Sequence, residues 1–282
     1  MPARLIAVAP TPPSPDWSRP RFARGNVGFR AFGQQKEDLE VDFGLRPQPL
    51  LETRILLCCG TDADGQRLDA PSCWELEVGR RIEALLTIAA LAGTSTLSIP
   101  LHCPNAKCGQ SMETELTVEE IVEIQRRAEA AEPTALVVEN KSFVLRKPTG
   151  VDQLLWLEAS YPDAARAMRS MVETLIAPGQ REEFQGASQV DGWLPAAERA
   201  LEAQDPLVDA ALEVRCPSCD ALARYPLDLA GLAIERLREV QGQLFTAVHR
   251  LASGYGWSEA ECFEVPAWRR ARYLELLDEE GS

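Results

Sequence analysis

The feature of this sequence that most constrains its fold is a pair of cysteine motifs far apart in the chain. The stretch LHCPNAKCGQ places Cys103 and Cys108 in a C-x4-C spacing, and VRCPSCD places Cys216 and Cys219 in a C-x2-C spacing. In each motif a proline follows the first cysteine, and a turn-forming glycine or aspartate follows the second. Closely spaced cysteines on a tight turn supply two thiolates to one metal ion, and structural zinc takes four such ligands. The sequence therefore predicts one structural Zn²⁺ bound by these four cysteines.

The segments on either side of each motif alternate like β-strands: STLSIPLH and QSMETEL around the first, ALEV and LARYPL around the second. We therefore expect two knuckles on short β-hairpins that face each other across one ion, as in a zinc ribbon split by a long insertion. His102 adjoins Cys103, but neighbouring strand residues point to opposite faces, so it is not expected to be a ligand. Three alternatives stay open: two rubredoxin-like turns without a metal, buried reduced cysteines, or iron instead of zinc.

The other cysteines are Cys58, Cys59, Cys73 and Cys262, and none has this turn context. We expect them to be buried as small apolar side chains. The N-terminal apolar run is only about five residues long, shorter than the core of a signal peptide. No stretch approaches the roughly 18 apolar residues that span a bilayer. We therefore expect a cytoplasmic protein with no membrane partner, in which paired cysteines bind metal rather than form disulfides.

Charge is distributed unevenly along the 282 residues, whose formal net charge is −14. The first 30 residues hold five arginines against one aspartate, a net charge of +4, which leaves −18 for the rest. An acidic surface repels phosphates, so no nucleic-acid partner is expected. The basic N-terminal stretch is interpreted as a docking arm whose partner-binding residues are Arg19, Arg21 and Arg24. A dangling terminus is the alternative.

The distribution of proline and of apolar residues divides the chain into three parts. Residues 1–45 are rich in proline and arginine and predict an extended arm. Residues 46–225 predict a mixed α/β body that contains both cysteine knuckles, and residues 226–282 predict a C-terminal helical region. Capping boxes predict helices that begin after Thr117, Thr149 and Ser258. The expected fold class is α+β and helix-dominated, with the split zinc ribbon clasping a helical body.

The sequence offers little to an enzyme. It has two histidines, His102 and His249, and lacks the nucleophile-elbow, P-loop, zinc-protease and dinucleotide-binding motifs. Nothing in it assembles a nucleophile, a base and an orienting group. We therefore predict that the protein is not an enzyme and takes no small-molecule substrate.

Four stretches, in the same order, resemble a known family: LSIPLHCPNAKCG, FVLRKPTGVDQLLW, DPLVDAALEVRCPSC and FTAVHRLASGYGWSEAECFEVPAWRRARYLELL. The family is the T-even-type baseplate protein family of contractile phage tails and contractile injection systems. The resemblance covers residues 45–278. It implies a structural or assembly component of the baseplate that is cytoplasmic during assembly and whose partners are hub, spike or wedge proteins. Two roles stay open: a resident of the finished particle, or an assembly chaperone.

The resemblance also implies roles for individual residues. The four motif cysteines match the family's paired knuckles. Further matches are Thr149, Gly150, Asp152 and Gln153 in a PTGxDQ turn, and His249, Tyr255, Trp257, Ser258, Glu259, Arg269, Arg270 and Tyr273 in the terminal helical motif. The sequence departs from the family pattern at Cys262, where an aliphatic residue is expected.

The terminal motif combines aromatic and arginine side chains on an acidic protein, a combination enriched at interface hot spots. The predicted partner-binding residues there are Trp257, Trp268, Arg269, Arg270, Arg272 and Tyr273; a solvated helix face is the alternative. A second function stays open, a zinc-ribbon protein that binds nucleic acid or assists transcription. The charge of −18 over residues 31–282 disfavours it.

Overall fold

The computed structural model describes residues 27–93, 95–130, 135–189 and 192–280. They form a helix-rich protein with small antiparallel strand pairs, which confirms this part of the predicted fold class. The helices are α1 Gln48–Cys59, α2 Ala70–Glu75, α3 Val78–Leu91, α4 Val118–Ala130, α5 Gly150–Glu158, α6 Ala164–Leu175, α7 Arg181–Ala187, α8 Leu194–Gln204, α9 Leu229–Tyr255, α10 Glu259–Glu264 and α11 Ala267–Glu280. Short 3-10 helices span Lys36–Glu40 and Pro178–Gln180. The strand pairs are β1 Val27–Phe29 with β2 Gly60–Asp62, β3 Thr96–His102 with β4 Ser111–Thr117, β5 Leu136–Val138 with β6 Lys141–Phe143, and β7 Ala211–Arg215 with β8 Leu222–Pro226.

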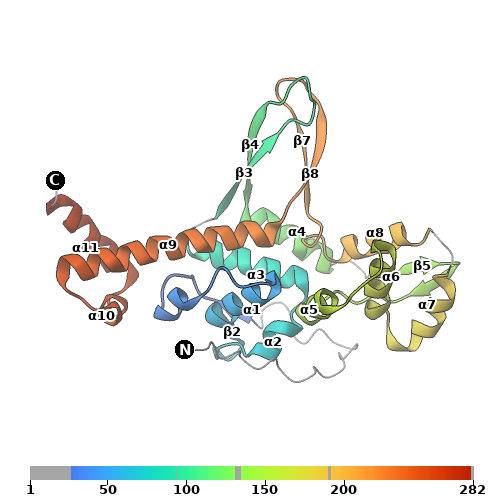
Figure 1. Ribbon diagram of the computed structural model, residues 1–282, viewed down its shortest axis with the longest axis horizontal. Coiled ribbons are helices and arrows are strands. Elements are labelled where there is room, and N and C mark those ends of the chain that lie inside the picture. The colour runs from blue at the N-terminus through green and yellow to red at the C-terminus, as the bar shows by residue number, and fades with distance from the viewer. Residues whose placement is uncertain (1–26, 94, 131–134, 190–191, 281–282) are drawn as a thin grey trace.

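The main core is formed by α1, α3 and the first half of α9, whose apolar faces meet in the body of the molecule (Figure 1). Residues 27–45, expected as part of an extended arm, belong to this core. Phe32, Val41 and Phe43 are buried in it. Asp38 fixes their loop because it is buried, forms a two-pronged ion pair with Arg30, and accepts three backbone N–H bonds. The body therefore begins by Val27 rather than at residue 46, and residues 1–26 of the expected arm lie outside the described part of the chain.

The predicted capping boxes are present at the starts of α4, α5 and α10. The apolar pattern over residues 73–93 predicts one helix, but the structure has two in this part of the chain, α2 and α3. The chain is extended at Leu76 and Glu77, where α3 restarts. Apolar spacing continues across this break, so periodicity alone does not reveal it.

A second lobe has a core of its own, formed by β5, β6, α6, α7 and α8. Phe184 lies at its centre, with ring centroids 5.3 Å from Phe143 and 5.2 Å from Trp193, both edge to face. Such pairs add about 0.5–1.5 kcal/mol to the effect of burial alone. The predicted single body 46–225 is thus two lobes with separate cores.

The C-terminal region is also divided. The first half of α9 belongs to the main core, whereas its second half packs with α10 and α11 in a small third core around Leu251 and Cys262. Figure 1 shows α9 running from the foot of the arm to this C-terminal end. The described part of residues 226–282 is therefore helical, as predicted, but the first half of α9 belongs to the core of the body.

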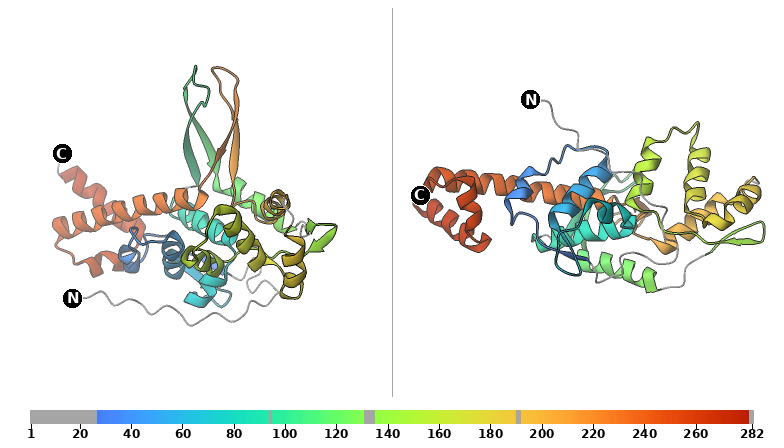
Figure 2. Two further views of the ribbon diagram at one scale, coloured as in Figure 1. Left: turned by 45° about the vertical axis from the view of Figure 1, so that its right-hand side comes forward. Right: turned by 90° about the horizontal axis from the view of Figure 1, so that it is seen from below.

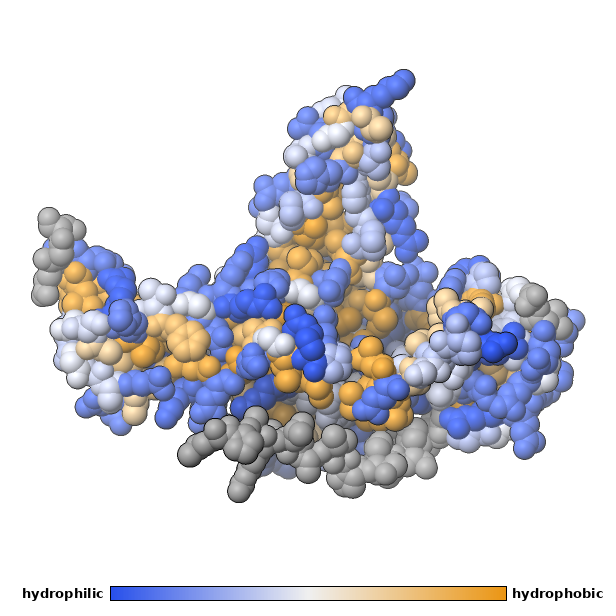
Figure 3. All heavy atoms as spheres, viewed as in Figure 1, coloured by the Kyte–Doolittle hydropathy of each residue, from blue (hydrophilic) through white to orange (hydrophobic). Residues whose placement is uncertain are grey.

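The hairpins β3–β4 and β7–β8 project side by side from the body and form an arm (Figures 1 and 2). Leu97, Ile99 and Leu101 of β3 are buried, while the residues between them are more exposed. Figure 3 shows apolar residues along the lower part of the arm and where it meets the body. The hairpins therefore stand away from the helical body, which corrects the expectation that they clasp it.

Candidate metal centre at the tip of the arm

The four predicted ligands meet at the tip of the arm. The sulfur atoms of Cys103, Cys108, Cys216 and Cys219 all lie within 4.8 Å of one another. Two of these distances join the hairpins: 3.6 Å between the Sγ atoms of Cys103 and Cys219, and 3.8 Å between those of Cys108 and Cys216. A tetrahedral ion with Zn–S bonds of about 2.3 Å separates its sulfur ligands by about 3.8 Å. The donor set and its spacing therefore fit one tetrahedral metal ion, whose identity the geometry leaves open between zinc and iron.

Backbone hydrogen bonds hold each knuckle in shape. In the first, the N–H of Cys108 donates to the carbonyl of Asn105 at 2.8 Å, and Gly109 adopts a left-handed φ of 58°. In the second, the N–H of Asp220 donates to the carbonyl of Cys216 at 2.9 Å, and Asp220 has a φ of 57°. Glycine and aspartate tolerate this conformation better than most residues. This is the physical reason for the turn-forming residue after each second cysteine.

The thiols differ in how readily they ionise. The backbone N–H of Ser218, aided by that of Cys219, lowers the pKa of Cys216 to about 7. For Cys103, the N–H of Asn105 acts in the same direction, but desolvation and hydrogen bonds with the other thiols outweigh it and raise the pKa to about 12. Because thiolates are the form that binds metal, metal binding to these four thiols is linked to the release of their protons.

Two neighbours support the site from outside the cysteine set. The hydroxyl of Tyr225 in β8 donates to the carbonyl of His102 in β3 at 3.0 Å, which joins the hairpins just below the tip. The Asn105 amide donates to the Cys219 sulfur at 3.7 Å. The His102 side chain is exposed and outside the sulfur cluster, as the alternation of strand faces predicts. Sequence reasoning missed Tyr225. The strand alternation places it on the less exposed face of β8 together with Ala223, and this is the signal that could have identified it.

The remaining cysteines are buried and lie outside this cluster. Burial raises the pKa of Cys59 and of Cys73 to about 12, so these thiols stay protonated and unreactive near neutral pH. This confirms the prediction that Cys58, Cys59, Cys73 and Cys262 are buried.

The predicted partner-binding residues differ in how exposed they are, and some of them lie outside the described chain. Arg19, Arg21 and Arg24 lie outside the described residues. Trp268 is 73% exposed. Trp257 stacks on Tyr255 and meets Tyr273 edge to face.

Three arginines complete that predicted set. Arg270 is buried and donates to the carbonyls of Cys262 and Gly33, so it holds α11 against the body. Arg269 is exposed and lies over the Tyr273 ring, and Arg272 forms ion pairs with Glu275 and Glu279. The exposed members of the set are therefore Trp268, Arg269 and Arg272.

The residues that match the PTGxDQ turn serve the junction between the lobes. Asp152 caps α5 by accepting from the Thr149 N–H and also pairs with Arg146. A side chain at Gly150 would lie 2.8 Å from the Arg81 guanidinium, so this glycine is required by close approach. In the terminal motif, His249 is exposed on α9, and Ser258 caps α10, which begins at Glu259.

No helix in the described part of the chain is both long enough and apolar enough to cross a lipid bilayer. Comparison with known proteins finds no matching family, no matching curated protein and no matching solved structure.

Proposed function

We propose that this protein is a structural or assembly component of the baseplate of a contractile phage tail or contractile injection system. One Zn²⁺ fixes its two hairpins into an arm that binds neighbouring hub, spike or wedge proteins. The observation that carries the proposal is the meeting of four cysteine sulfurs within 4.8 Å at the tip of a projecting arm. The ordered sequence stretches that resemble the baseplate family supply the kind of assembly.

A structural role for the metal follows from its ligands. Four thiolates complete a tetrahedral shell, whereas catalytic zinc keeps one position open for water or substrate. The two histidines are both exposed and lie on different elements, β3 and α9, so neither supplies such a site with a base. Structural zinc contributes on the order of 10 kcal/mol or more of apparent folding free energy. The role proposed for the metal is therefore to join two hairpins that few other contacts connect.

The charge of the arm supports a protein partner over nucleic acid. The strands and knuckles of the arm carry nearly equal numbers of basic and acidic residues. The basic ones are Lys107, Arg215 and Arg224, and the acidic ones are Glu113, Glu115, Glu213 and Asp220. Binding to nucleic acid depends on neutralising phosphates with lysine and arginine, and this near balance offers no basic face. A zinc-ribbon nucleic-acid protein remains the second candidate only because of the cysteine set.

Metal content tests the first half of the proposal. Elemental mass spectrometry of the purified protein is expected to find one zinc per chain, absent from a Cys216→Ser variant. A Cys58→Ala variant is the matched control, because this cysteine is equally buried but lies outside the cluster. Native protein without metal, or zinc retained by Cys216→Ser, would contradict a four-cysteine zinc site.

Association tests the second half. The zinc-loaded protein is expected to copurify with a hub, spike or wedge protein when the two are expressed together, and Cys216→Ser is expected to lose the partner. Binding to duplex DNA that weakens steeply as salt rises, with no baseplate protein retained, would favour the second candidate instead.

A further inference from the structure

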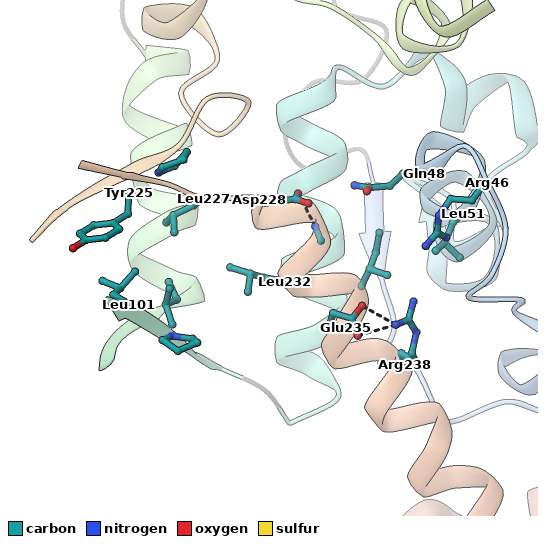
Figure 4. A pocket seen from close by; sticks show the side chains of 15 residues that line it. Arg46, Gln48, Leu51, Leu101, Tyr225, Leu227, Asp228, Leu232, Glu235 and Arg238 are labelled. Atoms are coloured by element: carbon teal, nitrogen blue, oxygen red, sulfur yellow. Dashed lines mark hydrogen bonds and ion pairs between the residues drawn. The ribbon is translucent and has the colours of Figure 1, made fainter. Parts of the chain in front are cut away.

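The foot of the arm carries an apolar groove of about 560 Å³ that β3, β8 and the helical body form together (Figure 4). Two stretches far apart in the sequence form its walls, Ile99–Leu101 of β3 and Tyr225–Leu227 at the end of β8. Its floor includes Leu232 of α9 and Leu51 of α1. The groove therefore joins the arm to the main core along an apolar surface.

The groove changes character along its length. In Figure 4, Leu101, Tyr225 and Leu227 lie at one end. Arg46, Gln48 and the ion pair between Glu235 and Arg238 lie toward the other, with Leu232 and Asp228 of the α9 end between the two groups. An occupant that fits has an apolar stretch next to charged residues.

Both walls carry a proline at a backbone position that points away from its own hairpin. The hydrogen bonds of Cys103 with Gln110 and of Leu227 with Ala210 set the pairing, so Pro100 and Pro226 face outward. A proline has no N–H to offer an incoming strand, which makes the walls poor templates for sheet extension. Proline-rich chains dock on aromatic rings in extended form at a low entropy cost, and Tyr225 offers one such ring in this groove.

We propose that this groove binds the chain's own N-terminal segment through the stretch APTPPSPDWSRPRF, residues 9–22. That stretch contains five prolines, two aromatic residues and two arginines, the combination of apolar and charged groups that the groove presents. The proposal goes beyond the baseplate function and does not rest on it.

The described chain begins close enough for this segment to reach. Phe29 pairs with Gly60 at the end of α1, and Leu51 near the start of α1 lines the groove. The path from Val27 to the groove runs along two residues of the β1–β2 pair and eight residues of α1, back to Leu51. At the usual rise per residue these lengths add up to about 20 Å. The prolines at positions 10–15 are 12–17 residues before Val27, which is about 40–50 Å of extended chain. The extended segment is therefore longer than the separation between Val27 and the groove, so it can follow a path over the surface.

Charge favours the same occupant. Residues 1–26 carry four arginines and one aspartate, a net charge of +3, and the rest of the chain carries −17. At the groove itself Asp228 and Glu235 are offset by Arg46 and Arg238, so the attraction comes from the acidic body as a whole. Attraction between a basic segment and an acidic body raises the rate at which the segment finds the groove.

Peptide binding to a truncated chain tests the proposal. A labelled peptide of residues 1–26 is expected to bind the zinc-loaded variant that lacks these residues, measured by fluorescence anisotropy. The full-length protein, whose own segment fills the groove, is expected to bind it about tenfold more weakly or worse. Leu232→Glu in the truncated chain is expected to lose at least about tenfold in affinity. The matched control is Phe245→Glu, an exposed apolar residue of the same helix outside the groove, which is expected to bind normally.

Hydrogen exchange gives a reading that needs no substitution within the groove. Amides of residues 98–102 and 225–232 are expected to exchange more slowly in the full-length protein than in the truncated one. Equal exchange, or peptide binding that Leu232→Glu leaves unchanged, would overturn the proposal. A concentration-dependent dimer that truncation abolishes would also overturn it, because the occupant would then be the segment of a second copy.

Discussion

Among single residues, Gly79 and Asp205 form a close link between the two lobes. The Gly79 N–H, in the first turn of α3, donates to the Asp205 carboxylate at 3.0 Å. A Cβ at Gly79 would lie 1.7 Å from Asp205 Oδ1, so only glycine permits this approach. Gln125 donates to the same carboxylate at 2.9 Å, while its own Oε1 accepts no hydrogen bond from the described residues. Burial raises the pKa of Asp205, and of Glu77 nearby, because the charged form loses its water.

Asp205→Asn should change how stability depends on pH. The raised folded-state pKa means that the folded protein holds the Asp205 proton at pH values where the unfolded chain has released it. Stability conferred by the neutral acid is therefore present below the ordinary pKa, about 3.9, and is lost as pH rises through the raised value. Asparagine stays neutral, accepts from Gly79, and can donate to Gln125 Oε1. Urea unfolding between pH 4 and 7 should show wild type losing stability relative to the variant as pH rises; parallel curves would contradict this.

Among the elements, the arm is the one that its own contacts support least. A two-stranded hairpin is marginal in water, and each of these hairpins forms a sheet of only two strands. An outward-facing proline in each hairpin removes one N–H from an edge through which the hairpins could pair, and in the described chain they form separate sheets. Their apolar faces, the Tyr225 hydroxyl and the proposed metal remain to hold them together.

Removing the metal should therefore loosen the arm before the body. With a strong zinc chelator, trypsin is expected to cut after Lys107 and Arg215 roughly tenfold faster, since local opening governs cleavage. Arg126 and Arg127 on α4 are as exposed as these sites and serve as internal controls whose cleavage rates should not change. Cleavage is followed by mass spectrometry. Equal cleavage rates at the tip with and without chelator would show that the metal does not hold the arm.

At the scale of the whole molecule, the described residues form three hydrophobic cores rather than one. The second lobe meets the first through polar contacts, including the hydrogen bonds from Gly79 and Gln125 to Asp205. A core that shares few apolar contacts with its neighbour can open without it. The second lobe should therefore behave as a separate unit in hydrogen exchange.

Phe184→Ala tests this separation. Truncating a fully buried phenylalanine costs about 3–5 kcal/mol, here confined to the second lobe. Hydrogen exchange should show lost protection in residues 136–145 and 172–200, with α3 and the arm unchanged and the metal content preserved. Uniform loss of protection across the chain would instead indicate one cooperative unit.

The sequence predicted those parts of the fold whose cause is local. Cysteine spacing with its turn residues identified the four clustered thiols, and capping boxes identified the starts of α4, α5 and α10. Features that depend on distant partners could not be predicted. Apolar alternation in β3 shows that one face is buried but not that the hairpin leaves the body. Residues 27–45 pack into the main core through contacts with α9, such as the bond from Gln241 to the carbonyl of Val41, 200 residues away in the chain. The groove beside Tyr225 likewise depends on α9.

The separation between the two halves of the cysteine cluster has a consequence for the newly made chain. Cys108 and Cys216 are 108 residues apart. A ribosome adding roughly 5–20 residues per second makes the first pair of thiols about 5–20 s before the second. During that interval the nascent chain holds half of the cysteine cluster, open to oxidants and to other thiols. Capture of the proposed metal is thus a late step of biosynthesis, reached only after the whole second lobe has emerged.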